Sequence, residues 1–149
     1  MSSLHPLTTD DLAAVTAIEA DVARSPWNLS MFTTELEQGS FGRVLTVAEG
    51  GIAGYLLLRP LLDEWHLMTI GVARHQQRRG WGRLLLQTGI DHARRQQGRT
   101  LLLEVRPSNL PARRLYDALG FRLLHRRRHY YTTPTAEDAL VMALSLVQP

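Results

Sequence analysis

The central segment of the chain reads Leu67-Met68-Thr69-Ile70-Gly71-Val72, then the turn Gln77-Arg78-Arg79-Gly80-Trp81-Gly82-Arg83, then a helical run from Leu84 to Gln97. The first amides of a helix lack intrahelical partners, and the aligned peptide dipoles place partial positive charge at the same end. Two glycines permit positive φ and close approach of a ligand. Three arginines beside a helix N-terminus are unfavourable unless an anion is bound. The segment therefore predicts a site for a polyanionic cofactor, although a tight turn with solvated arginines fits the spacing equally well.

A second apolar run follows this helix and contains one carboxylate. Gly98 ends the helix, and Thr100 to Arg106 is typical of a strand that is buried on both faces. Glu104 interrupts the run, and a carboxylate at such a position requires either a cleft or an arginine partner. The sequence leaves both explanations open.

The remaining elements follow from capping residues, apolar spacing and turn signals. Helices are expected from Thr9 to Ala23, from Asn28 or Ser30 to Gly39 after Pro26-Trp27, and from Pro111 to Leu119 after the turn Pro107-Ser108-Asn109. Strands are expected at Arg43–Ala48 and Ile52–Leu58, joined by the turn Glu49-Gly50-Gly51, and in a terminal hairpin at Phe121–Tyr131 and Leu140–Leu146. This order predicts a mixed α/β sheet.

Composition limits the possible classes of protein. A chain of 149 residues with 44% hydrophobic content is expected to form a single domain, residues 1–149, with a core that needs no metal or disulfide. The absence of cysteine excludes disulfides and a thiolate nucleophile. No signal peptide or membrane-spanning run is present, so a cytoplasmic protein is expected.

The basic residues suggest anionic ligands. The net charge is +3, and arginines cluster at Arg78 to Arg83 and at Arg126 to Arg128. The second cluster precedes Tyr130 and Tyr131, a combination that suits either an RNA-binding patch or one wall of a peptide groove; we favour the groove. No metal site is expected, because His125 and His129 have no third ligand at a suitable spacing.

Several motifs mark a family. Gln-x-x-Gly-x-Gly after a strand resembles the acetyl-coenzyme A pyrophosphate loop of the GCN5-related N-acetyltransferases (GNAT). The chain is similar to the RimI-like branch, the ribosomal-protein alanine N-acetyltransferases, over nearly its whole length. The similar segments are Pro26-Trp27, Leu62-Asp63-Glu64, Leu103-Glu104-Val105-Arg106-x-Ser108-Asn109, Leu115-Tyr116-x-x-Leu119-Gly120-Phe121, Arg127-Arg128-x-Tyr130-Tyr131 and Glu137-Asp138-Ala139.

The resemblance implies a fold and a cofactor site. The expected fold is a single-domain GNAT fold, in which a mixed central sheet is splayed between its fourth and fifth strands and flanked by helices. The pantetheine arm of acetyl-coenzyme A (acetyl-CoA) would enter this gap. The residues expected to bind the coenzyme are Ile70, Gly71, Val72, Gln77, Arg78, Arg79, Gly80, Trp81, Gly82, Arg83, Asn109 and Tyr116.

The resemblance also implies an activity. Glu104 would take a proton from the acceptor amine and Tyr116 would protonate the leaving thiolate. The acceptor would be the N-terminal peptide of a protein, namely the N-terminal alanine of small-subunit ribosomal protein eighteen, with no direct nucleic-acid binding. Residues expected on the acceptor side are Trp27, Asp63, Glu64, Tyr130 and Tyr131. Alternatives are an acetyltransferase for other N-termini or a small amine, and a non-catalytic RNA- or ribosome-binding module.

Overall fold

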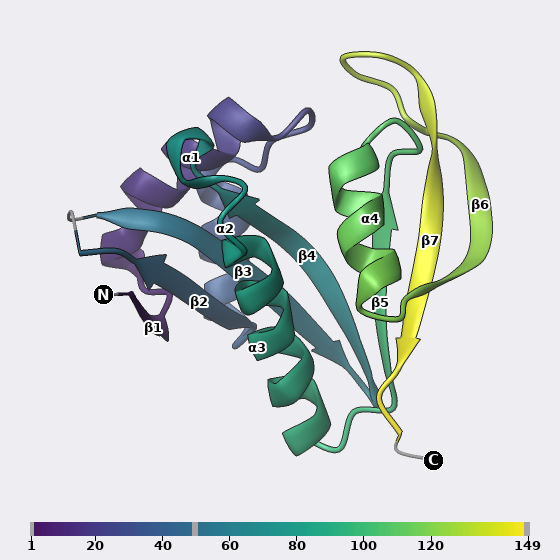
Figure 1. The fold of residues 1–149 in the computed structure, drawn as a ribbon, viewed down its shortest axis with the longest axis horizontal. Coiled ribbons are helices and arrows are strands. Elements are labelled where there is room, and N and C mark those ends of the chain that lie inside the picture. The colour runs from purple at the N-terminus through teal and green to yellow at the C-terminus, as the bar shows by residue number, and fades with distance from the viewer. Residues whose placement is uncertain (1, 49–50, 148–149) are drawn as a thin grey trace.

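The computed structural model describes residues 2–48 and 51–147. In these residues seven strands form one sheet in the order β1-β2-β3-β4-β5-β7-β6 (Figure 1). The strands are β1 (Ser3–Pro6), β2 (Phe41–Thr46), β3 (Ile52–Leu61), β4 (Glu64–Val72), β5 (Thr100–Val105), β6 (Arg122–Tyr131) and β7 (Glu137–Ser145). The helices are α1 (Leu12–Val22), α2 (Leu29–Glu37), α3 (Trp81–Arg95) and α4 (Leu110–Ala118), with 3₁₀ turns η1 (Thr9–Asp11) and η2 (Arg74–Gln76).

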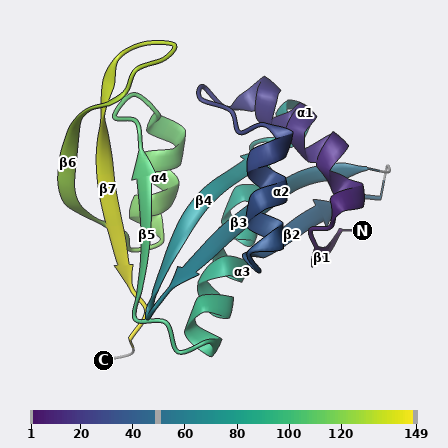
Figure 2. The same cartoon turned by 180° about the vertical axis from the view of Figure 1, so that it is seen from behind.

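The sheet divides into two arms between β4 and β5. These two strands are parallel and pair only at Glu64–Thr100, Trp65–Leu101 and His66–Leu102 in the part of the chain that the structure describes. Beyond these pairs the strands diverge into a V, which is open toward the carboxyl end of β4 (Figures 1 and 2). The mixed sheet and its predicted splay between the fourth and fifth strands are therefore confirmed.

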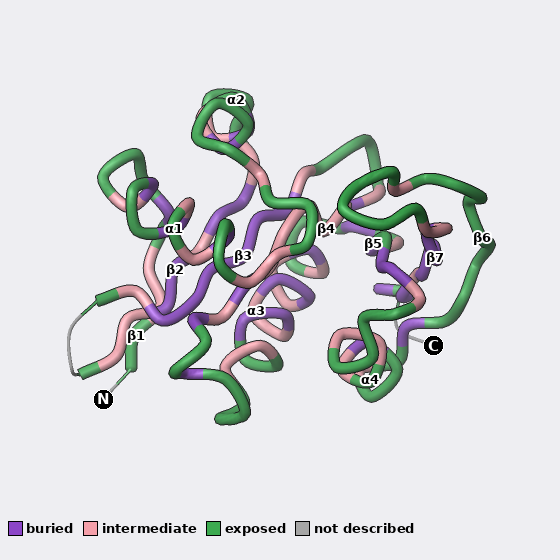
Figure 3. The backbone as a smooth tube through the Cα atoms, turned by 90° about the horizontal axis from the view of Figure 1, so that it is seen from above, coloured by how far each residue is buried: buried purple, intermediate pink, exposed green. Residues whose placement is uncertain are grey.

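Helices cover both faces of the sheet. Helices α1 and α2 lie on one face, and α3 and α4 lie on the other (Figure 3). Strand β3 serves both cores because successive side chains of a strand point to opposite faces. Leu56 and Leu58 pack with α3, whereas Tyr55 and Leu57 pack with α1 and α2.

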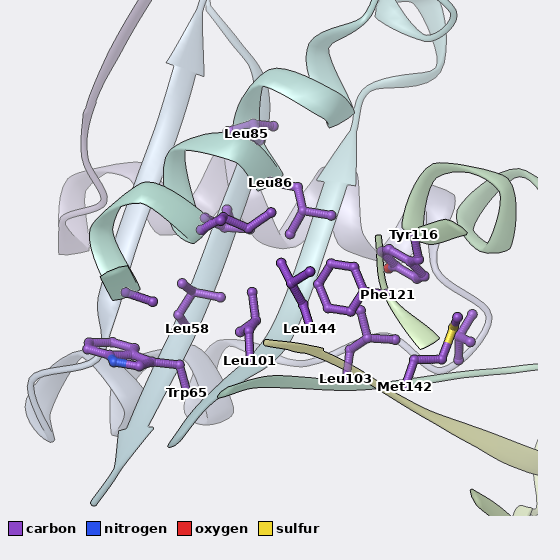
Figure 4. Close-up of a cluster of buried hydrophobic side chains, with 14 of the residues drawn as sticks. Leu58, Trp65, Leu85, Leu86, Leu101, Leu103, Tyr116, Phe121, Met142 and Leu144 are labelled. Carbon is purple, nitrogen blue, oxygen red and sulfur yellow. The ribbon is translucent and has the colours of Figure 1, made fainter. Parts of the chain in front are cut away.

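The larger core joins the two arms. Buried side chains of α3, β4, β5, α4 and β7 form one cluster across the closed end of the V (Figure 4). Trp65, Leu101 and Leu144 lie where β4 and β5 still pair. This packing holds the arms at one end and leaves the other end of the gap free to accept a ligand.

Several element predictions need correction. Strand β1 was not expected, since four residues carry no alternating pattern on their own. Helix α3 begins at Trp81 rather than at Leu84. In β5, Leu101, Leu103 and Val105 are buried but Glu104 is exposed, so the prediction of a strand buried on both faces is wrong. Glu104 instead faces the cleft between the two arms of the sheet.

Two further predictions concern turns and caps. The expected cap of α2 is Asn28, whose Oδ1 accepts a hydrogen bond of 2.9 Å from Met31 N. Residues 49 and 50 of the expected turn Glu49-Gly50-Gly51 lie outside the described residues, although β2 and β3 do pair antiparallel as predicted. Among the helices of the described residues, none is long and apolar enough to cross a membrane.

Candidate active site

Glu104 lies in a cleft of about 1080 Å³ between the two arms. Because side chains alternate along β5, Leu103 and Val105 enter the core and Glu104 points to the opposite face. Its side chain is 33% exposed, and its Oε1 accepts a hydrogen bond of 3.3 Å from Arg127 Nη1. The sequence left two explanations open for this carboxylate, a cleft and an arginine partner, and the structure shows both.

Strand β6 becomes irregular directly after Arg127, which still pairs with Ala139 of β7. The pairing register of β6 with β7 is interrupted between Arg127 and Tyr131, and His129 adopts a φ of 51°. Asp138 stabilises the irregular segment: its Oδ1 accepts from His129 N at 2.9 Å, and its Oδ2 accepts from Arg126 Nη1 at 3.1 Å. Such a bulge redirects side chains; Tyr130 lies within it, and the centre of its ring is 4.2 Å from the Arg127 guanidinium.

Tyr130 and Tyr131 both line the cleft, as expected for one wall of a groove. Their ring centres are 5.1 Å apart, and the Arg106 guanidinium lies 4.2 Å from the centre of the Tyr131 ring. Burial, together with the nearby Glu104 charge, raises the pKa of Tyr131 to about 12. Burial likewise raises the pKa of Tyr130 above its usual value. Both phenols are therefore neutral hydrogen-bond donors at physiological pH.

Tyr116 reaches the same cleft from α4. It is only 5% exposed and packs against Phe121, with ring centres 5.7 Å apart. Burial, with a smaller effect of the Tyr131 charge, raises the pKa of Tyr116 to about 12. Asn109, which also lines the cleft, caps α4 by accepting a 3.3 Å hydrogen bond at Oδ1 from Ala112 N. Glu104, Tyr116 and Asn109 thus all line one cleft.

The opposite wall is held by a residue that the sequence analysis did not identify. Glu19, on α1, is 2% exposed and its carboxylate accepts three hydrogen bonds: from Tyr55 Oη at 2.5 Å, Thr69 Oγ1 at 2.9 Å and Trp27 N at 3.0 Å. These bonds tie the segment after α1 to β3 and β4, so Trp27 is fixed at the cleft. The available signal was a carboxylate on the apolar stripe of α1, between Val15 and Val22.

Only one of the two glycines of the turn before α3 adopts the expected positive φ, because Gly82 lies inside the helix. Gly80 precedes the helix with a φ of 85°, a conformation that suits glycine. The first intrahelical bond runs from Leu84 N to Gly80 O at 3.1 Å, so the amides of residues 81–83 precede the hydrogen-bonded ladder. Gln76, a buried residue that sequence reasoning missed, accepts hydrogen bonds at Oε1 from Arg79 Nη1 at 3.2 Å and Trp81 Nε1 at 3.4 Å.

The backbone of β4 faces the gap at alternate residues. Ala73 N bonds to Ala53 O on β3 at 2.8 Å, so the polar groups of Val72 and Ile70 point the other way, into the gap. Gln77 Nε2 donates a hydrogen bond of 2.9 Å to the Val72 carbonyl, and the Val72 N–H points into the same gap. Gly71 has a packing role, since a Cβ there would overlap the Tyr55 hydroxyl.

The structure places two expected acceptor residues away from the cleft. Asp63 and Glu64 lie at the closed end of the V, where β4 still pairs with β5, and they do not line the cleft. The Asp63 carboxylate is 3.9 Å from Arg99 Nε, and the Glu64 carboxylate is 3.5 Å from His66 Nε2. Within residues 2–48 and 51–147, no three His, Asp or Glu side chains are grouped so as to hold a metal ion.

Residues 12–121 match the model of the acetyltransferase (GNAT) family, so the chain belongs to that family. Its predicted class, an acetyl-CoA-dependent N-acetyltransferase, is confirmed. The alternative of a non-catalytic RNA-binding module is thereby disfavoured.

Individual relatives are similar over their full lengths. The chain is 38% identical to the [ribosomal protein bS18]-alanine N-acetyltransferase of Escherichia coli (strain K12), over 98% of this chain and 99% of that protein. It is 34% identical to the enzyme of the same name from Haemophilus influenzae, over 98% and 100%. The crystal structure of the E. coli ribosomal-protein-S18-alanine N-acetyltransferase matches with a TM-score of 0.92 at 37% identity, covering 100% of this chain and 96% of that one.

Proposed function

We propose that this protein transfers the acetyl group of acetyl-CoA to the N-terminal α-amino group of a protein, and that the acceptor is the N-terminal alanine of ribosomal protein bS18. The observation that carries the proposal is the cleft, in which Glu104 and Tyr116 face one space between the segment after α1 and strand β6. The full-length relatives named for this reaction support the choice of acceptor. An acceptor of this kind also places the protein in the cytoplasm.

In this proposal Glu104 and Tyr116 each carry out one proton transfer of the reaction. A peptide α-amino group has a pKa of about 7.7–8.0, so a useful fraction is neutral at physiological pH. Glu104, directly or through a water molecule, takes the proton that the amine loses as its nitrogen attacks the thioester carbonyl. The carbon–sulfur bond then breaks, and Tyr116 gives its proton to the departing thiolate. Acetyl-CoA supplies the activated acetyl group, so no enzyme nucleophile is needed.

The coenzyme would be held by groups that the fold leaves free. The turn at Gly80 and the open amides of residues 81–83 suit the pyrophosphate, because the helix dipole adds to the N–H donors there. The Val72 N–H and the Ile70 backbone suit the pantetheine amides. Arg78, Arg79 and Arg83 supply positive charge beside the turn.

A panel of acceptors tests this function. The purified protein and acetyl-CoA are incubated with the N-terminal peptide of bS18, with the same peptide blocked at its α-amine, and with small amines. We expect mass spectrometry to show one acetyl group on the free peptide and none on the blocked one. Acetylation of small amines alone would overturn the proposed acceptor. Acetylation of the blocked peptide on a side chain would overturn the proposed α-amine specificity.

Tyr131 provides a prediction about acceptor binding. Tyr131→Ala removes a ring from the wall of the cleft, so we expect the acceptor KM to rise about tenfold, the value of a lost aromatic contact, while the acetyl-CoA KM stays within twofold. Tyr131→Phe keeps the ring and its stacking on Arg106, so its acceptor KM should remain near that of the wild type. A Tyr131→Ala variant whose acetyl-CoA KM rises while its acceptor KM stays at the wild-type value would contradict this assignment.

A further inference from the structure

Strand β6 carries two adjacent arginines with different partners. Arg126 pairs with Asp138 at 3.1 Å, outside the cleft, and Arg127 pairs with Glu104 at 3.3 Å. The two arginines are similarly exposed, at 52% and 49% of their side chains. Arg127 is not among the residues that line the cleft, so it contacts the carboxylate from the side while the cleft face of Glu104 stays open. A role for Arg127 must therefore act through Glu104.

The acceptor reaches the enzyme mainly as an ammonium ion. A carboxylate without a neighbouring cation would bind this ion but would also hinder the loss of its proton. An opposite charge within about 4–6 Å stabilises the charged form of a group. A lone Glu104 carboxylate would therefore raise the pKa of the bound ammonium and retain its proton. An ammonium has no lone pair with which to attack a thioester. A second cation beside the carboxylate offsets this effect, because it repels the ammonium and favours the neutral amine.

We infer that Arg127 is a positioning residue whose guanidinium balances the Glu104 charge, so that the acceptor amine is bound and attacks in its neutral form. The inference rests on the proposed role of Glu104 as the base for an amine acceptor. It applies to an N-terminal amine and to a small amine alike, because both must lose a proton before attack.

The surroundings fix Arg127 in this position. Its guanidinium stacks on Tyr130 at 4.2 Å, and the bulge that contains Tyr130 is held by Asp138, which accepts a hydrogen bond from His129 N. Tyr130 contributes a phenol whose pKa is raised by burial, so it adds no charge near neutral pH. The paired guanidinium is thus the positive charge that lies beside Glu104.

The other charged groups that face the cleft from the neighbouring elements have partners of their own. Glu19 accepts three hydrogen bonds from neutral donors, Glu35 pairs with Arg59, and Arg106 pairs with Glu137 at 3.2 Å. Arg24 lies 3.4 Å from Ser108 Oγ, and His66 lies at the closed end of the V. The pKa of Tyr116 and of Tyr131 is raised to about 12. None of these groups differs between the variants compared below.

The test is the pH dependence of acetyl transfer in a single turnover, measured from pH 6.5 to 9.5 with saturating acetyl-CoA and acceptor. Arg127→Met keeps an unbranched side chain that reaches as far as the arginine Nε, and it removes the charge. We expect its ascending limb to move about one pH unit higher, the low end of the effect of one nearby charge because the pair is partly solvated. Its rate should be about tenfold lower at pH 7 and approach that of the wild type near pH 9.5.

Two variants serve as controls. Arg127→Lys restores the charge, so its ascending limb should return toward the wild-type position. Arg126→Met removes the neighbouring arginine and its pair with Asp138, and its profile should match that of the wild type. These two controls distinguish the effect of the charge beside Glu104 on the pH–rate profile from the effect of the total charge of β6.

Two results would overturn the inference. One is a wild-type profile for Arg127→Met, and the other is a rate that falls by the same factor at every pH, which a displaced Glu104 would cause. Failure of the proposed acceptor is a separate outcome. If the wild-type enzyme acetylates only a small amine, bS18 is not its acceptor. The pH–rate profiles of the variants, measured with that amine, then still test the role of Arg127.

Discussion

Replacing Glu104 with Gln lowers the rate of acetyl transfer by roughly 10²–10⁴ at neutral pH, the usual contribution of a positioned acid or base. The amide has the same size but cannot take the proton of the acceptor amine. The side chain is partly exposed on the cleft side of β5, so the core around Leu103 and Val105 is unaffected. We therefore expect the acetyl-CoA KM and the thermal unfolding midpoint to stay near the wild-type values, while kcat falls.

Glu64→Gln is the matched control for this variant. Glu64 is also a half-exposed glutamate on a central strand, but it lies at the closed end of the V, outside the cleft. Its kcat and its acceptor KM should remain near those of the wild type. This control also tests the sequence-based expectation that Glu64 contacts the acceptor, because a large rise in its acceptor KM would support that expectation. Equal kcat values for the two variants would remove Glu104 from the proposed mechanism.

The features that could be predicted from the sequence depend on neighbouring residues in the chain. The conformation at Gly80 and the cap at Asn28 are determined within a few residues, and both occur as expected. The position of Glu104 in a strand follows from the apolar run around it. The splay of the sheet came from the resemblance to a family, because no spacing within β4 or β5 reveals where two strands separate.

The features that could not be predicted depend on contacts between distant segments. Glu19 binds partners on β3 and β4 and fixes Trp27, and nothing in α1 alone specifies those donors. The bulge in β6 depends on Asp138 in the neighbouring strand. Periodicity also could not show that β5 has one open face, because an apolar residue beside a cleft and one in a core look alike in sequence.

A second large effect is expected for Tyr116→Phe, whose rate of acetyl transfer should fall about 100-fold, the lower end for a lost general acid. The phenylalanine ring preserves the contact with Phe121 and occupies the same space in the hydrophobic core. The change removes only the proton that the thiolate takes as the carbon–sulfur bond breaks. Both substrates should therefore bind as before, and the loss should appear in kcat with both KM values nearly constant.

The raised pKa of Tyr116 extends this prediction to the alkaline range. A general acid works only while it is protonated, so its loss of a proton produces a limb in which the rate falls as pH rises. Because burial raises the pKa of Tyr116 to about 12, this limb should be absent below about pH 11. The wild-type rate should instead rise through the pKa of the acceptor amine and then level off. A falling limb near pH 9 in the wild type that disappears in Tyr116→Phe would show that the phenol ionises far too early, and this result would contradict the buried environment assigned to it.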